Sequence, residues 1–244
     1  TFRGGQEDII RHIGNGHDTL GLMPTGGGKT ITFQVPTLAQ EGLCLVITPL
    51  IALMKDQVRN LRDRGIKATA IYSGMTREEI IVALENCIFG NYKFLYISPE
   101  RLDSEIFQTK LRHMKVCLIT VDESHCISQW GFDFRPDYLR LKDFIQTIRR
   151  VPILALTATA TDEVLNDIEA YLSMDNPFKY IHAIDRPNIK LVKKEFLRRN
   201  DKKQWIVEHL ETTAGPGIVY MQSRNRANEL AKELAHKGLA VAAY

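Results

Sequence analysis

Short apolar runs alternate along the chain with stretches in which apolar residues recur at helical spacing. An uninterrupted apolar run is typical of a strand buried on both faces of a sheet, and recurrence every three to four residues is typical of an amphipathic helix. The predicted strands are residues 19–23, 43–48, 68–72, 94–98, 116–121 and 153–157. The predicted helices are residues 30–40, 51–64, 77–89, 101–113, 136–149 and 162–172. This alternation predicts an α/β fold in which helices flank a parallel sheet.

A second, shorter series of elements begins near residue 184. It consists of predicted strands at 217–221 and 240–244 and a predicted helix at 224–237. Residues 173–180 are polar, and the Asp-Arg-Pro-Asn stretch at 185–188 favours an extended crossing or a turn. We therefore expect a first domain over residues 1–183 and a truncated second domain over residues 184–244, as in a fragment of a longer protein.

Composition narrows the class of protein. The 244 residues are 44% hydrophobic and 25% charged, as in globular proteins, and 32 Lys and Arg against 29 Asp and Glu leave a net charge of +3. Any nucleic-acid surface must therefore be local. Because no apolar run approaches the roughly 20 residues that span a bilayer, and because no secretory signal is visible, we expect no membrane segment. The four cysteines lack the short paired spacing of a zinc site, which favours reduced core thiols in an intracellular protein.

A glycine-rich segment follows the first predicted strand and opens a predicted helix. Residues 23–30 read Met-Pro-Thr-Gly-Gly-Gly-Lys-Thr. Glycines let backbone N–H groups approach phosphates closely, Lys29 can reach the outer phosphates, and the Thr30 hydroxyl can ligate Mg²⁺. Met23 stands where the general phosphate-loop pattern has Gly, a form that resembles the helicase variant of the loop. The predicted nucleotide-binding residues here are Thr25, Gly26, Gly27, Gly28, Lys29 and Thr30.

Two carboxylates follow the predicted strand at 116–121. Asp122 and Glu123 precede Ser124 and His125. The carboxyl ends of parallel strands are where such sheets bind ligands. With a phosphate loop upstream, we predict that Asp122 holds Mg²⁺ and that Glu123 polarises the attacking water.

Several segments together resemble the RecQ family of superfamily 2 DNA helicases. The resemblance covers nearly the whole chain and is carried, besides the segments above, by residues 2–6, 46–58, 96–102, 125–136, 156–160 and 218–224. Three positions depart from the family pattern: Gly4 stands for Pro, Ser124 for Ala and Phe132 for His. The resemblance implies RecA-like domains, with Arg3 and Gln6 reading adenine and His125 completing the catalytic set of Lys29, Asp122 and Glu123. It also implies that an arginine acting in hydrolysis lies beyond Tyr244.

The most family-specific segment, residues 125–136, is rich in aromatic residues and is called the aromatic segment below. Its aromatic side chains alternate with polar residues and Gly131, a composition poorly suited to a strand or helix. Exposed aromatic faces can stack on bases at roughly 1–3 kcal/mol each, and an arginine can contact phosphate; the alternative is that these aromatics lie in the core. The DNA-binding or coupling residues implied in this and the other segments are Thr48, Ser98, Arg101, Trp130, Phe132, Phe134, Arg135, Thr157, Thr159 and Ser223.

The function that the resemblance implies is ATP-dependent unwinding of duplex DNA in recombination and repair, with 3′→5′ travel on single-stranded DNA. ATP and Mg²⁺ are the expected cofactors, and zinc is expected only in a region outside this chain. The expected partners are single-stranded and forked duplex DNA, a single-strand binding protein and repair factors, without a membrane; the oligomeric state stays open. The expected location is the cytoplasm near the nucleoid of a bacterium or the nucleus of a eukaryote. Two alternatives are an RNA helicase or duplex translocase, and an ATP-gated DNA-binding module without turnover.

Overall fold

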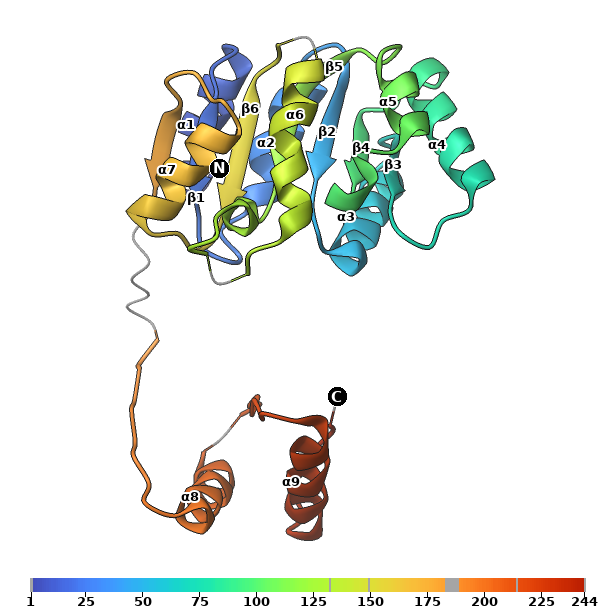
Figure 1. Cartoon of the computed structure of the whole chain (residues 1–244). Coiled ribbons are helices and arrows are strands. Elements are labelled where there is room, and N and C mark those ends of the chain that lie inside the picture. The colour runs from blue at the N-terminus through green and yellow to red at the C-terminus, as the bar shows by residue number, and fades with distance from the viewer. Residues whose placement is uncertain (1, 132, 149, 183–188, 214, 244) are drawn as a thin grey trace. The chain divides into compact units, whose positions relative to one another are not determined.

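The chain folds as two units, residues 1–185 and 186–244. The computed structural model describes residues 2–131, 133–148, 150–182, 189–213 and 215–243. The first unit contains a sheet of seven parallel strands in the order β3-β4-β2-β5-β6-β1-β7 (Figure 1). The strands are β1 (Thr19–Leu22), β2 (Leu43–Ile47), β3 (Ala68–Ile71), β4 (Phe94–Ile97), β5 (Val116–Val121), β6 (Ile153–Thr157) and β7 (Phe178–Ile181). This arrangement confirms the predicted α/β fold with a parallel sheet.

Helices cover both faces of this sheet. They are α1 (Gln6–Gly14), α2 (Lys29–Leu38), α3 (Ile51–Asp63), α4 (Arg77–Phe89), α5 (Glu105–Leu111), α6 (Arg140–Thr147) and α7 (Asp162–Tyr171). Buried side chains of α1, α2 and α3 form one apolar core with Cys44 and Val46 of β2. Those of α4, α5, α6 and α7 form the other core with Leu45 and Ile47. Successive residues of a strand point to opposite faces, so an uninterrupted apolar strand supplies both cores at once.

Two predicted helices are shorter than their sequence pattern. Residues 99–101 form a 3₁₀ turn, and α5 begins only after Ser104, whose hydroxyl accepts a hydrogen bond from the N–H of Phe107. Residues 136–139 likewise form a 3₁₀ turn before α6. Pro99 and Pro136 each open one of these turns, because proline has the right φ for a first turn but no N–H to continue a ladder.

Two elements of the first unit were not predicted from the sequence. The sequence pattern predicts no helix before residue 30, yet α1 starts at Gln6 and buries Ile9 and Ile13. Strand β7 lies in the polar segment assigned to the region between domains, and it pairs with β1 at the edge of the sheet. Only alternate residues of β7 are half-buried, so it lacks the continuous apolar run of the central strands.

The second unit contains α8 (Arg199–Thr212) and α9 (Arg224–His236), of which only α9 was predicted. The predicted strand at 217–221 is wrong, and no strand forms at 240–243; residue 244 lies outside the described residues. Backbone N–H and C=O groups of a strand need a neighbouring strand, and the described part of this unit offers none. Ile218 and Tyr220 are accordingly exposed.

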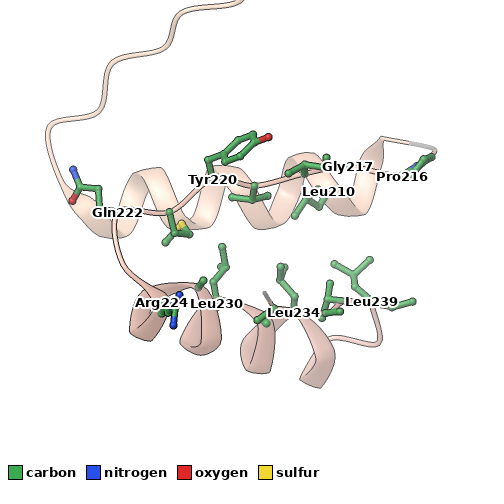
Figure 2. Close-up of a pocket in the computed structure, with 18 of the residues that line it drawn as sticks. Leu210, Pro216, Gly217, Tyr220, Gln222, Arg224, Leu230, Leu234 and Leu239 are labelled. Atoms are coloured by element: carbon green, nitrogen blue, oxygen red, sulfur yellow. The ribbon is translucent and has the colours of Figure 1, made fainter. Parts of the chain in front are cut away.

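A cavity of about 800 Å³ lies between α8, α9 and the extended residues beside them. Figure 2 shows Leu210, Leu230 and Leu234 among the side chains that line it. The lining contains none of the phosphate-loop or acidic residues, so the cavity belongs to the packing of this unit rather than to the predicted chemistry. Within the described ranges of both units, no helix has the length and apolar character that crossing a bilayer requires.

Candidate functional site

The phosphate loop connects the carboxyl end of β1 to the first turn of α2. Gly26 and Gly28 have φ values of 76° and 78°, in the left-handed region that favours glycine. Gly28 is also the N-cap of α2 and supplies no side-chain cap, so the first N–H groups of the helix lack that intramolecular acceptor. Such N–H groups at the positive end of a helix form an anion site. The loop therefore fits a phosphate group.

Arg3 and Gln6 hold this loop from outside. The Arg3 guanidinium donates to the carbonyl of Gly26 at 2.7 Å, and the Gln6 amide donates to the carbonyls of Gly27 and Gly28 at 3.2 Å each. The Gln6 side-chain oxygen accepts from the Arg3 backbone N–H at 2.8 Å. A Cβ on Gly28 would lie 2.3 Å from the Gln6 amide nitrogen, so this contact requires glycine. Both residues shape the phosphate loop, and their role in reading adenine stays a prediction.

The acidic pair lies where β5 ends, beside the lysine of the loop. The Lys29 ammonium nitrogen is 3.7 Å from a Glu123 carboxylate oxygen. Glu123 has a φ of 50°, a left-handed conformation that is uncommon for glutamate and that is found in excess at functional sites. Its backbone N–H donates to the Asp122 carboxylate at 3.0 Å. The structure thus brings Lys29 beside the adjacent pair Asp122 and Glu123, which lie far from it in the sequence.

Asp122 is buried, with 8% of its surface exposed. The pKa of Asp122 is raised to about 6, mainly by burial and also by the negative charge of Glu123, whereas the positive charge of Lys29 opposes the rise. A buried carboxylate that is costly to ionise alone is well suited to a divalent cation, since the cation compensates its charge. Asp122, together with the hydroxyl of Thr30 at the start of α2, therefore fits the predicted Mg²⁺ site.

His125 connects Glu123 to the end of β6. Its Nδ1 lies 2.9 Å from the Thr157 hydroxyl and 3.4 Å from a Glu123 carboxylate oxygen. The Thr157 hydroxyl donates to the carbonyl of Thr159 at 3.1 Å, so this hydroxyl accepts from His125. Burial lowers the pKa of His125, although Glu123 has the opposing effect, and this lowering favours the neutral ring. The acceptor beside Nδ1 places the ring hydrogen on that nitrogen. Sequence reasoning named these residues but not this connection.

The predicted DNA-side residues lie at the carboxyl ends of β2 and β4, which are neighbours in the sheet. The hydroxyl of Thr48 and the Nε of Arg101 are buried without a hydrogen-bond partner, and so is the side-chain oxygen of Gln57, which we had not singled out. Unsatisfied buried polar atoms are uncommon and call for a ligand or a water. Ser98 differs, because its hydroxyl donates to the Glu100 carboxylate at 2.7 Å.

The aromatic segment leaves Trp130 80% exposed, so this residue is not part of the core. Phe134 is half-buried, and Arg135 contacts the Asp133 carboxylate at 2.8 Å. The predicted residue Phe132 lies outside the described residues. In the second unit, Ser223 is the N-cap of α9 and accepts from the N–H of Arg226 at 3.4 Å. The DNA-binding or coupling roles stay predictions.

Comparison with known proteins agrees with these features. The sequence pattern of the DEAD/DEAH box helicase family, whose domain is an ATPase domain, matches residues 3–168. The chain is 42% identical over 238 residues to a probable ATP-dependent DNA helicase RecS of Bacillus subtilis, covering 97% of this chain and 48% of that protein. It is 42% identical over 244 residues to the ATP-dependent DNA helicase RecQ of Haemophilus influenzae, covering 100% of this chain and 39% of that protein. The chain thus spans less than half of these relatives.

Among solved structures, the DUF1998 helicase MrfA has a similar fold, with a TM-score of 0.76 at 18% identity over 98% of this chain and 39% of that one. The helicase domain of Pyrococcus furiosus Hef has a TM-score of 0.57 at 19% identity, covering 98% of this chain and 48% of that one. At such low sequence identities, these structures show a similarity of fold alone. The matched family pattern covers more than half of the residues. The chain therefore belongs to the DEAD/DEAH box helicase family, and its relatives within it are RecQ-type DNA helicases.

Proposed function

We propose that this chain forms the ATP-hydrolysing part of a RecQ-type helicase that unwinds DNA by 3′→5′ movement on a single strand, in recombination and repair. The observation that carries the proposal is a continuous set of contacts from the phosphate loop to β6. Lys29 contacts Glu123, Glu123 contacts His125, and His125 contacts Thr157. The two relatives named above support DNA as the substrate.

The chain's own groups suit phosphoryl transfer to water. Bound ATP with Mg²⁺ supplies the phosphoryl group and a metal charge that balances its oxygens. The N-terminus of α2 and Lys29 would hold the phosphates, and Asp122 with Thr30 would hold the metal. Glu123 takes up the proton of the attacking water at a carboxylate oxygen. The ring of His125, held by Thr157, lies beside that carboxylate with its Nδ1 at 3.4 Å and limits the positions that the carboxylate can take.

The same histidine suggests how DNA could control hydrolysis. Thr157 is the last residue of β6 and Thr159 comes shortly after it, and Trp130 is exposed on the segment that begins at His125. A base stacked on Trp130 would bias the conformation of this segment and hence the position of His125 against Glu123. This arrangement favours coupled turnover over an ATP-gated module that binds DNA without hydrolysis.

Unwinding assays with the complete protein that contains this chain test the proposal. Forks of DNA and of RNA, each with a 3′ or a 5′ single-stranded tail, should be compared with ATP and Mg²⁺. We expect ATP-dependent separation of the 3′-tailed DNA fork only. Equal activity on RNA forks would favour the RNA helicase, unwinding of 5′-tailed DNA would refute the direction, and binding without hydrolysis would favour the module. A single-strand binding protein in the assay should trap the separated strands and raise the yield.

A further inference from the structure

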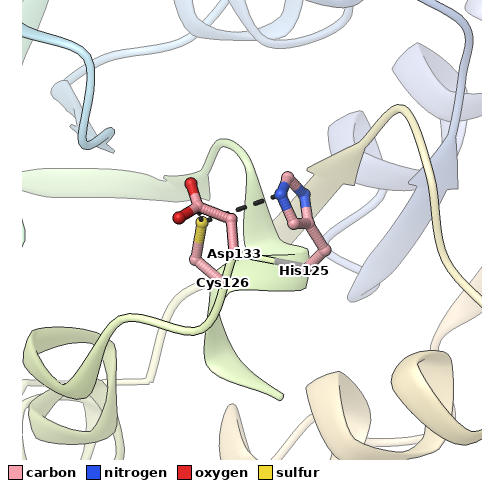
Figure 3. Close-up of side chains that lie close together, drawn as sticks. All are labelled: His125, Cys126 and Asp133. Carbon is pink, nitrogen blue, oxygen red and sulfur yellow. Dashed lines mark hydrogen bonds between the residues drawn. The ribbon is translucent and has the colours of Figure 1, made fainter. Parts of the chain in front are cut away.

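Three side chains of different chemistry converge beside the catalytic carboxylate. His125 Nε2 lies 3.8 Å from the Cys126 sulfur, and that sulfur lies 3.9 Å from a carboxylate oxygen of Asp133. The three atoms all lie within 4.8 Å of one another. Figure 3 shows the three side chains turned toward one point. His125 and Cys126 lie in the 3₁₀ turn after β5, where the aromatic segment begins, and Asp133 lies further along the same segment.

The contacts of His125 at Nδ1 leave its other ring nitrogen, Nε2, free to bind a metal. Nδ1 faces two acceptors, the Thr157 hydroxyl oxygen and the Glu123 carboxylate, and therefore carries the ring hydrogen. Nε2 then has the lone pair, and it faces the Cys126 sulfur. Histidine ligands of metals commonly donate their other N–H to a carboxylate or similar acceptor, as His125 does here.

The ligand set selects the class of cation. Thiolate, imidazole and carboxylate are the ligands of zinc, whereas Mg²⁺ prefers oxygen alone. With Zn–S of about 2.3 Å and Zn–N of about 2.0 Å, tetrahedral ligand atoms lie about 3.5 Å apart, so contacts of 3.8 and 3.9 Å need only a small contraction. A thiolate and a carboxylate together balance the charge of a divalent ion. Three protein ligands leave a fourth position for water.

We propose that His125, Cys126 and Asp133 bind one zinc-like divalent cation at the junction of the catalytic carboxylate and the aromatic segment. Arg135 competes for this site, because its Nη2 and Nε both contact the Asp133 oxygen that faces the thiol, at 2.8 and 3.1 Å. Metal binding takes Asp133 from Arg135 and fixes the ring of His125. Occupancy should therefore slow hydrolysis, a consequence that rests on the proposed function, whereas the binding itself does not.

Cobalt is the probe for this site, since Co²⁺ replaces zinc and reports its ligands by absorbance. The chain, free of nucleotide and Mg²⁺, is titrated with Co²⁺. We expect one equivalent to bind with a thiolate-to-cobalt charge-transfer band, and Zn²⁺ to bleach it. Cys126→Ser should remove the band. Asp133→Asn, at an exposed position, should weaken binding by roughly tenfold or more, the scale of losing one supporting contact of a metal site.

Two further variants separate the site from general effects. Arg135→Gln should tighten cobalt binding because it removes the competing cation, and Cys117→Ser, at a cysteine outside the cluster, should leave the band unchanged. Absence of a thiolate band at saturating Co²⁺ would overturn the proposal. So would a band that survives Cys126→Ser, or unchanged cobalt affinity in Asp133→Asn; the latter test stays available if Cys126→Ser does not fold. ATP hydrolysis is not measured, so failure of the proposed function would leave these results intact.

Discussion

Asp122→Asn should make the chain more stable at neutral pH when nucleotide and divalent cations are absent. The carboxylate is buried, and its pKa rises from an ordinary 3.8 to about 6 mainly because burial disfavours the charged form. Asparagine keeps an oxygen that can accept the hydrogen bond from the Glu123 N–H and removes the charge. The substitution therefore isolates the cost of holding an uncompensated carboxylate in the site.

The sign and size follow from proton linkage. The folded state binds the Asp122 proton more tightly than the unfolded state, so this contribution to stability is fully present below about pH 4 and is lost as the pH rises to about 6. A rise of about two pH units corresponds to about 3 kcal/mol. The free energy of unfolding of the variant should therefore exceed that of the unsubstituted chain by an amount that grows from near zero at pH 4 to about 3 kcal/mol at pH 7. Any pH-independent difference between the two chains adds equally at every pH.

Guanidinium unfolding followed by circular dichroism, in EDTA at several values between pH 4 and pH 7, measures this difference. Asp56→Asn, at an exposed carboxylate on α3, controls for the change from acid to amide. Mg²⁺ with nucleotide should narrow the gap, because the charged carboxylate would then have a cation partner. A stability difference that stays constant across this pH range, or that shrinks as the pH rises, would refute the reasoning.

Three other variants test separate parts of the site. Gln6→Ala removes contacts to two loop carbonyls and should weaken ATP binding about tenfold, as expected for about 1–2 kcal/mol of hydrogen bonding. It should also erode a preference for ATP over GTP, and unchanged competition between the two nucleotides for the site would contradict both expectations. Gly28→Ala would place a Cβ 2.3 Å from the Gln6 amide nitrogen and a side chain at a φ of 78°. It should weaken ATP binding at least as much as Gln6→Ala in a chain whose circular dichroism is unchanged; normal binding would show that the loop tolerates a side chain. Trp130→Ala, at a residue that is 80% exposed, should change the free energy of unfolding by less than about 0.5 kcal/mol. It should reduce the DNA-stimulated rate of hydrolysis more than the DNA-independent rate, and a large loss of stability would show that Trp130 packs in the core.

The sheet was predictable because its central strands are apolar throughout. Most of the helices beside it were predictable from apolar residues that recur at helical spacing. Strand β7 was not, because an edge strand with one half-buried face has no continuous apolar run. The predicted strand at 217–221 failed for a related reason: an apolar pattern predicts a strand only where another strand can pair with it. Local pattern does not contain that information.

Lys29, Asp122 and Glu123 could be predicted to meet because parallel strands end at the same edge of a sheet. The contact of His125 with Thr157 could not, since it depends on the side-by-side packing of β5 and β6. The approach of Asp133 to Cys126 depends in turn on how an irregular segment folds back, which residue spacing does not encode. The signal available in the sequence was only a histidine and a cysteine next to each other after a catalytic pair.

The central claim is that Glu123 activates water at a phosphate site held by Lys29. It is tested most directly by measuring ATP binding and ATP hydrolysis, with and without single-stranded DNA, in the complete protein and in its Glu123→Gln and Lys29→Ala variants. Glu123→Gln should bind ATP with unchanged affinity and hydrolyse it about 10²–10⁴-fold more slowly, the usual contribution of a general base. Lys29→Ala should lose affinity and turnover together. Hydrolysis by Glu123→Gln within a few-fold of the unsubstituted protein would contradict the account.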